Sequence, residues 1–227
     1  MLAVKRSDEN PILSPDKKNF WEAEAAFNGC VVKSGKNFHM VYRAMSARQK
    51  VYGNEMELST VGHAVSGDGI NFEKKEQFIK PEYDWERFGC EDPRVTEVGG
   101  KYYIFYTALS THPFTPEGIK VGLAITRDFK TIDEKHPVTN FNSKAMALFP
   151  DKVNGKFAAI LAANTDKPPV KIGLAFFDKE SDIWSPAYWD KWYKDLDKNS
   201  IDLKRKVSDH FEVGAPPIKT EKGWLFV

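Results

Sequence analysis

The chain has 227 residues, of which 41% are hydrophobic and 29% charged, and its formal net charge is +1. This length suits one large all-β domain or two small ones, and near-neutrality disfavours a nucleic-acid-binding protein. No stretch approaches the roughly 20 apolar residues of a membrane helix, and the N-terminus becomes polar too early for a signal peptide. Two cysteines do not form a disulfide framework. We therefore expect a cytoplasmic protein that contacts neither nucleic acid nor a membrane.

One unit recurs along the chain: a short strand, a Gly-rich turn and a second, mostly aromatic or apolar strand. The Asn-Gly and Gly-Gly turns supply the positive φ angles of tight hairpins. A further strand follows each of the first three copies, so the unit repeats at roughly 55–70 residues. The four copies span residues 27–44, 92–108, 147–161 and 214–227, and the further strands lie at 61–72, 121–129 and 172–178.

Repeated units of three or four strands are typical of a β-propeller, in which each unit is one blade. A β-sandwich with accidental similarity between its turns is the alternative. The fourth copy ends at Val227, within its second strand. We therefore expect residues 1–227 to form a single propeller domain that is incomplete at the C-terminus and stops in the fourth blade. The segment 179–209 breaks the pattern and is interpreted as a long connection or a short helical insert.

The residues that begin each repeat should point toward a shared central channel, and they include Asn28, Asp92 and Glu212. Asp92 is the best candidate for a general acid, because a carboxyl group near an apolar wall can retain its proton. Neighbours in a strand point to opposite sides, so we expect at most one of Glu91 and Asp92 to face the channel. Arg94 should share the face of Asp92. A solvated Glu-Asp-Pro turn is the alternative.

Glu212 precedes a Gly-Ala-Pro-Pro segment and is a candidate general base or acceptor for a sugar hydroxyl; a loop carboxylate is the alternative. His210 could bind phosphate, donate to a hydroxyl group or pack against its neighbours. The five histidines are scattered, without the spacing of a metal motif. We expect no metal and no cofactor.

Several short segments, in order through almost the whole chain, resemble glycoside hydrolase family 130, the β-mannoside phosphorylases and β-mannosidases. The resemblance implies a five-bladed propeller, an inverting mechanism and Asp92 as the proton donor. It also implies an oligosaccharide substrate, with Asn28, Arg43, Glu91, Arg94, Lys144 and His210 as candidate substrate-binding residues. The matching segments are Asn10-Pro11-Ile12-Leu13, Trp21-Glu22, Phe27-Asn28, Tyr42-Arg43-Ala44, Ser66-Gly67-Asp68-Gly69, Glu91-Asp92-Pro93-Arg94, Leu148-Phe149-Pro150, Val153-Asn154-Gly155-Lys156, Gly214-Ala215-Pro216-Pro217-Ile218 and Gly223-Trp224.

Three departures from the family pattern concern phosphate. The strand at 160–164 has no Arg, the expected Lys-Asp pair reads Lys144-Ala145, and an expected Tyr-His pair would fall beyond Val227. We therefore favour hydrolysis, with Glu212 activating water, over phosphorolysis with inorganic phosphate as co-substrate, and keep both. An arabinan- or fructan-type propeller glycosidase and a non-catalytic sugar-binding propeller are the alternatives. The protein is expected to be a monomer or a homo-oligomer.

Overall fold

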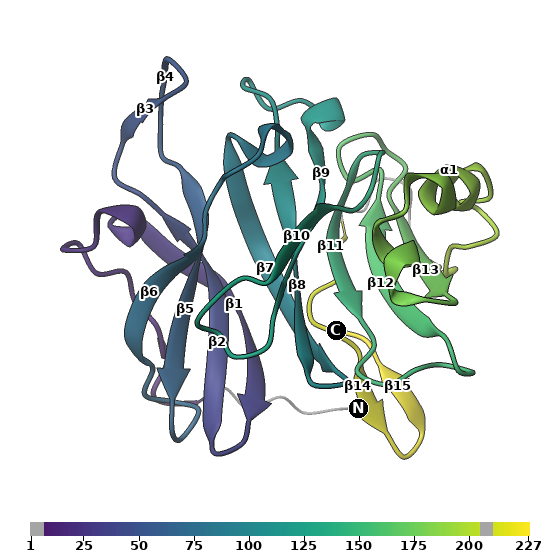
Figure 1. Ribbon diagram of the computed structural model, residues 1–227, viewed down its shortest axis with the longest axis horizontal. Helices are drawn as coiled ribbons and strands as arrows, with labels where there is room; N and C mark the ends of the chain where they lie inside the picture. The colour runs from purple at the N-terminus through teal and green to yellow at the C-terminus, as the bar shows by residue number, and fades with distance from the viewer. Residues whose placement is uncertain (1–6, 205–210) are drawn as a thin grey trace.

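Three antiparallel sheets stand side by side in the part of the chain that the computed structural model describes, residues 7–204 and 211–227 (Figure 1). The strand order is β1-β2-β5-β6 in the first sheet, β10-β9-β8-β7 in the second and β11-β12-β13 in the third. The predicted all-β class is confirmed. The strands are β1 (Ala25–Ser34), β2 (Asn37–Met45), β5 (Ser59–Ser66), β6 (Glu73–Ile79), β7 (Gly89–Val98), β8 (Lys101–Leu109), β9 (Ile119–Thr126), β10 (Glu134–Pro137), β11 (Ser143–Leu148), β12 (Phe157–Ala163) and β13 (Lys171–Phe177).

Short elements connect and flank these sheets. Two ribbons pair β3 (Gln49–Val51) with β4 (Asn54–Met56) and β14 (Ile218–Thr220) with β15 (Gly223–Leu225). Residues 180–184 and 186–194 of the segment 179–209 are helical, as one of the two interpretations of that segment predicted. The helices are the 3₁₀ helices η1 (Phe20–Glu22), η2 (Asp84–Glu86), η3 (Pro116–Gly118) and η4 (Glu180–Trp184), and the α-helix α1 (Pro186–Lys194).

The predicted hairpin turns are present in all four copies of the repeat. In each, two residues pair across a two-residue turn, and in the first three copies at least one turn residue has a positive φ. Asn154 and Gly155, for example, have φ angles of 50° and 79°. The residues that pair across the turns are Ser34 with Asn37, Val98 with Lys101, Val153 with Lys156 and Thr220 with Gly223.

The first strands of the three sheets lie together, since β1 packs against β7 and β7 against β11. Apolar side chains fill the spaces between the sheets, and this burial is the main source of their stability. Between the first and second sheets the core includes Val41 and Ile104. Between the second and third it includes Leu123 and Leu148, and α1 covers it with the buried Trp189.

A buried carboxylate supports the first sheet. The Glu22 side chain is fully buried at the end of η1. Tyr42 donates a hydrogen bond of 2.8 Å to its Oε2, and Lys75 donates one of 3.2 Å to its Oε1. The ring of Tyr42 lies directly over Gly62, where a Cβ would come within 2.3 Å of it. The cluster therefore needs a glycine at this point of β5.

The second sheet repeats this cluster. Glu86 of η2 is fully buried and accepts hydrogen bonds of 2.5 Å from Tyr106 and of 2.5 Å from Lys135. A Cβ at Gly122 would lie 2.7 Å from Trp85 and 2.8 Å from Tyr106. A buried charge is tolerated only when it is paired and hydrogen-bonded, and both carboxylates meet this condition. Each cluster connects the 3₁₀ helix before the first strand of a sheet to other strands of that sheet.

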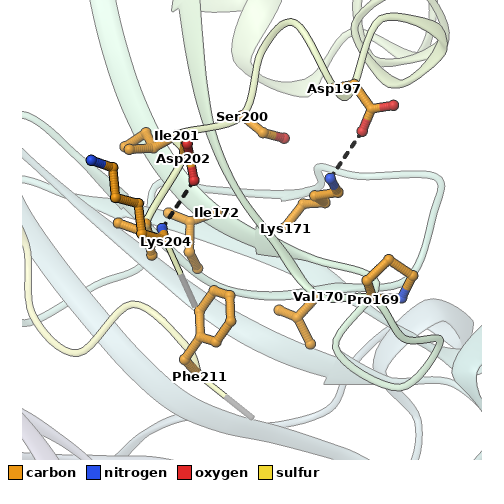
Figure 2. A pocket seen from close by; sticks show the side chains of 11 residues that line it. Pro169, Val170, Lys171, Ile172, Asp197, Ser200, Ile201, Asp202, Lys204 and Phe211 are labelled. Carbon is orange, nitrogen blue, oxygen red and sulfur yellow. Dashed lines mark hydrogen bonds and ion pairs between the residues drawn. The ribbon is translucent and has the colours of Figure 1, made fainter. Parts of the chain in front are cut away.

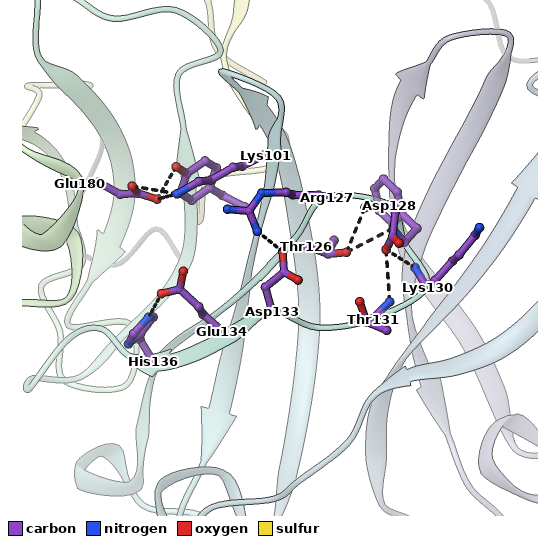
Figure 3. Close-up of polar contacts among 12 residues, drawn as sticks. Lys101, Thr126, Arg127, Asp128, Lys130, Thr131, Asp133, Glu134, His136 and Glu180 are labelled. Carbon is purple, nitrogen blue, oxygen red and sulfur yellow. Dashed lines mark hydrogen bonds and ion pairs between the residues drawn. The ribbon is translucent and has the colours of Figure 1, made fainter.

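Polar contacts on the outside of the second sheet attach η4 to it (Figure 3). Lys101 and Tyr103 both contact the Glu180 carboxylate, at 2.7 Å from its Oε1. Arg127 and Asp133 form an ion pair of 2.6 Å further along the same surface. Exposed pairs of this kind contribute about 0–1 kcal/mol each, so they position the connection more than they stabilise the fold.

Candidate active site

The same backbone irregularity occurs in the first strand of each sheet. In β1, β7 and β11 the pairing register shifts by one residue, which marks a β-bulge. The first bulged residue has a positive φ in all three strands: 50° at Asn28, 50° at Asp92 and 53° at Ala145. Asn and Asp tolerate this left-handed conformation better than most residues. Asn28, Asp92 and Ala145 are therefore equivalent positions of the repeat.

The bulge changes where the two adjacent carboxylates of β7 point. Arg43 lies 2.5 Å from Glu91 Oε1 and 3.5 Å from Asp92 Oδ1. Both side chains thus reach one guanidinium group, and the expectation that only one of them faces this space is wrong. The physical reason is that strict alternation holds for a regular strand, whereas a left-handed residue re-aims its side chain.

Asp92 is held from two sides. Asn28 Nδ2 donates a hydrogen bond of 2.7 Å to Asp92 Oδ1, the same oxygen that Arg43 approaches. Arg43 is itself oriented by Ser59, to whose hydroxyl it donates a hydrogen bond of 3.1 Å, and by the ring of Phe27 at 5.0 Å. The Asp92 side chain remains 22% exposed, so a substrate can reach it.

Glu91 is the more enclosed of the two carboxylates. Burial raises the pKa of Glu91 above its usual range, although the nearby charges of Arg43 and Lys144 and a hydrogen bond from Ser59 act in the opposite direction. The negative charge of Asp92 adds to the increase. Glu91 and Asp92 thus lie beside one arginine in different environments. Such a difference allows one carboxyl group to act as an acid and the other as a base.

Arg94 crosses the site toward the C-terminal segment. Its NH1 donates a hydrogen bond of 2.8 Å to the main-chain carbonyl of Asp92, and its NH2 one of 2.6 Å to that of Val213. Burial lowers the pKa of Arg94, while the charges of Asp92, Cys30 and Glu212 raise it. Arg94 therefore connects the main chain at Asp92 with the main chain at Val213. It also lies close enough to the two predicted catalytic carboxylates, Asp92 and Glu212, for their charges to act on its pKa.

Lys144 belongs to the third sheet and pairs with Asp166 at 3.1 Å. Burial alone would raise the pKa of Asp166, but hydrogen bonds from Asn142, Thr165 and Lys144 lower it below its usual range. Asp166 is thus a well-held counterion in the loop after β12. Lys144 also acts on the pKa of Glu91, so this ion pair borders the cluster of Arg43 and the two carboxylates.

The predicted residues Asn28, Arg43, Glu91, Asp92 and Arg94 come together in one cluster, and Lys144 and Glu212 border it. His210 lies outside the described residues. The sequence interpretation missed Ser59 and Asp166, which orient Arg43 and Lys144. Neither belongs to a recognisable motif. The sequence interpretation also missed the buried Glu22 and Glu86 clusters. Their segments, Trp21-Glu22 and Trp85-Glu86, are 64 residues apart in the chain, as Asn28 and Asp92 are.

A separate cavity of about 250 Å³ lies beside the start of β13 (Figure 2). Its lining includes Val170, Ile172 and Phe211, with the ion pair of Lys171 and Asp197 at one side. None of the predicted catalytic residues lines it.

Within residues 7–204 and 211–227, no group of three or more His, Cys, Asp or Glu side chains is placed to hold a metal ion. No helix in the same described ranges is long and apolar enough to span a membrane.

The model of glycoside hydrolase family 130, described as β-1,4-mannooligosaccharide phosphorylase, matches residues 4–227. The chain belongs to this family.

Known proteins of the family are similar to the chain over its whole length. A β-1,2-mannobiose phosphorylase of Thermoanaerobacter sp. (strain X514) is 33% identical over 238 residues, which cover 100% of this chain and 72% of the relative. A 1,2-β-oligomannan phosphorylase of the same strain is 30% identical and covers 100% of this chain and 71% of the relative. The structure of the β-1,2-mannobiose phosphorylase of Listeria innocua has the same fold, with a TM-score of 0.67 at 22% identity over 97% of this chain and 73% of that one.

Proposed function

We propose that the protein cleaves β-mannosidic bonds with inversion and that Asp92 donates a proton to the leaving oxygen. The observation that carries this proposal is the cluster in which Asn28 and Arg43 hold Asp92 at a repeated bulge. Both contacts are made to Oδ1, so we assign the proton to Oδ2. As the bond between C1 and the glycosidic oxygen breaks, that oxygen takes the proton, and a nucleophile forms a new bond to C1 from the opposite face.

Phosphate is the nucleophile that the relatives favour, because the curated proteins that match the whole chain are named mannoside phosphorylases. Attack of a phosphate oxygen on C1 of a β-mannoside would give α-mannose 1-phosphate and the shortened sugar. Arg94 Nε supports this candidate. It is buried and has no hydrogen-bond partner among the described residues, so it is a donor that an anion could satisfy.

Water is the second candidate nucleophile, and the charges of the site favour it. Arg43 and Lys144 are already paired with carboxylates of the chain, and Arg94 is bonded to two carbonyls. The strand β12 offers no arginine. In a hydrolase, Glu212 would activate the water. Inverting enzymes place their two carboxyl groups about 6.5–9.5 Å apart, and we expect this separation between Asp92 and Glu212.

The two nucleophiles are separated by incubating the protein with β-1,2-mannobiose or β-1,4-mannobiose, with and without inorganic phosphate. We expect α-mannose 1-phosphate, formed only when phosphate is present. Free mannose released at an unchanged rate without phosphate would contradict phosphorolysis and support the role of Glu212. No cleavage of either disaccharide under both conditions would contradict the proposed activity.

The ion pair of Lys144 and Asp166 provides a second test of the nucleophile. Asp166→Asn removes the counterion of Lys144 and keeps the size of the side chain. If phosphate binds beside Lys144, KM for phosphate should fall while KM for mannobiose changes little. Asp178→Asn is the matched control, since this exposed carboxylate pairs with Lys156 at a different part of the surface. An equal effect of both variants would contradict a phosphate site beside Lys144.

We further propose that the whole domain is a five-bladed propeller, supported by three sheets with equivalent bulges and turns. A cytoplasmic location, the absence of nucleic-acid and membrane partners, and the oligomeric state stay predictions. Cell fractionation tests the location and membrane association, an electrophoretic mobility-shift assay tests nucleic-acid binding, and light scattering after size-exclusion chromatography tests the oligomeric state.

A further inference from the structure

A second pocket lies where η1, the β3–β4 hairpin and the segments on either side of η2 meet. It has a volume of about 440 Å³, within the range of pockets that hold small ligands. Trp21 of η1, Tyr52 of the β3–β4 hairpin and Arg87 after η2 are among the residues that line it. Leu58 and Thr60 also contribute, and they flank Ser59, the residue that orients Arg43. None of Arg43, Glu91 and Asp92 lines this Tyr52 pocket.

Tyr52 occupies a backbone position that does not suit it. Val51 pairs with Asn54 across a two-residue turn, in which Tyr52 has a φ of 47° and Gly53 a φ of 86°. Such turns favour Asn-Gly, because a bulky residue with positive φ is strained. Burial does not compensate for the strain, since the Tyr52 side chain is 69% exposed. Conformational strain of this kind is often retained where a side chain is needed for function.

The rings in the pocket present flat faces next to cationic groups. The Arg87 guanidinium lies 5.1 Å from the centre of the Tyr52 ring, and Phe88 packs edge-on against the same ring at 5.6 Å. Tyr and Trp rings have an apolar face and a polar edge, which suits stacking on the apolar face of a pyranose. Trp21, which packs against Tyr42 at 6.3 Å, is a second ring in the lining.

The charges of the pocket are all positive. Lys50, Lys80 and Arg87 line it, and no carboxylate does. Arg87 pairs with Asp84, whereas Lys50 and Lys80 form no ion pair with any residue of the described ranges. Two lysines and an arginine around one pocket favour a phosphate group. The side chains of Gln49 and Gln77 add polar groups for sugar hydroxyls.

We propose that the Tyr52 pocket binds a phosphorylated hexose, at a site separate from Asp92. The sugar ring stacks on Tyr52, and Lys50 and Lys80 bind the phosphate. This site does not depend on whether the enzyme uses phosphate or water as its nucleophile, because it shares no residue with the Asp92 cluster.

The test labels the protein with 5-fluorotryptophan and follows the ¹⁹F signal of Trp21, assigned through Trp21→Phe. Mannose 1-phosphate and glucose 6-phosphate should shift this signal saturably. Mannose and inorganic phosphate should bind at least 10-fold more weakly, because each provides only half of the contacts. If mannobiose or inorganic phosphate shifts the signal at equal concentrations, or if no sugar phosphate shifts it, the proposal is wrong.

Two variants then assign the contacts. Lys50→Gln with Lys80→Gln should weaken sugar-phosphate binding at least 10-fold, while Lys191→Gln with Lys194→Gln, exposed on α1, should leave it unchanged. Tyr52→Asn should also weaken binding at least 10-fold. Unchanged affinity in either pocket variant would overturn the proposal, whatever the cleavage activity of the protein.

Discussion

Asn28 and Asp92, 64 residues apart in the chain, occupy the same left-handed bulge position in neighbouring sheets and are joined by a hydrogen bond of 2.7 Å. The repeat thus places an amide and a carboxyl group face to face. In each sheet a bulge re-aims one side chain toward the shared space. The proposed chemistry therefore depends on a local backbone geometry that is repeated along the chain.

The amide of Asn28 should matter for turnover more than for stability. Asn28→Gly keeps a residue that adopts positive φ readily and removes the donor to Asp92. We expect kcat on mannobiose to fall about 10-fold, the effect of one hydrogen bond to a charged or reacting group, with Tm nearly unchanged. Asn154→Gly is the control, because Asn154 has the same φ of 50° in a remote turn. Full activity of Asn28→Gly would show that this hydrogen bond does not position Asp92.

The glycines under the buried tyrosines should contribute measurably to stability. Gly62→Ala and Gly122→Ala would place a Cβ 2.3 Å from Tyr42 and 2.7 Å from Trp85. Overpacking of this kind typically costs about 1–3 kcal/mol, which urea unfolding would measure. Gly67→Ala should be neutral, since no atom lies within 4 Å of the added Cβ. Equal stability of all three variants would contradict the described packing.

Stability should fall at alkaline pH because of the buried tyrosines. Burial, with a smaller contribution from Glu22, raises the pKa of Tyr42 well above its usual range, and burial likewise raises the pKa of Tyr106. A group whose pKa is higher in the folded state stabilises the protein below its unfolded pKa, about 10 for tyrosine. That contribution is lost as the pH rises further.

We therefore expect the tyrosines to lower the free energy of unfolding above about pH 10, in addition to a decrease that begins at about pH 8.5 because burial also raises the pKa of Cys30 and of Cys90. Tyr42→Phe with Tyr106→Phe should lower stability at pH 8, because each buried carboxylate loses a donor at a cost of about 1–3 kcal/mol. The same variant should show a shallower decrease above pH 10. An identical alkaline decrease in both proteins would assign it to other groups.

The fold could be predicted from the sequence where the local signal is strong. Turns such as Asn154–Gly155 require positive φ, and the strands beside them are rich in β-branched and aromatic residues, so the hairpins follow from local preferences. The helical insert after β13 was less certain, because its Trp-rich sequence suits a connection as well as a helix. Its role in covering the core between two sheets depends on Trp189, whose burial is a tertiary effect.

The site could be predicted only in part. Asp92, Glu91 and Asn28 stand at starts of the repeat, and that position identified them. Their orientation did not follow, because the β-bulge breaks the alternation that a regular strand would impose. Ser59 and Asp166 were missed because their contacts with Arg43 and Lys144 depend on the spatial arrangement of separate segments, which no local motif encodes.

The proton-donor role of Asp92 is tested most directly by Asp92→Asn on two substrates that differ in their leaving group. On β-mannobiose, whose leaving oxygen needs a proton, turnover should fall by about 10²–10⁴, the usual range for a lost general acid. On 2,4-dinitrophenyl β-mannoside, whose leaving group needs no proton, the loss should be much smaller, with Tm unchanged. Near-full activity on β-mannobiose, or an equal loss on both substrates, would contradict the assignment of Asp92 as the proton donor.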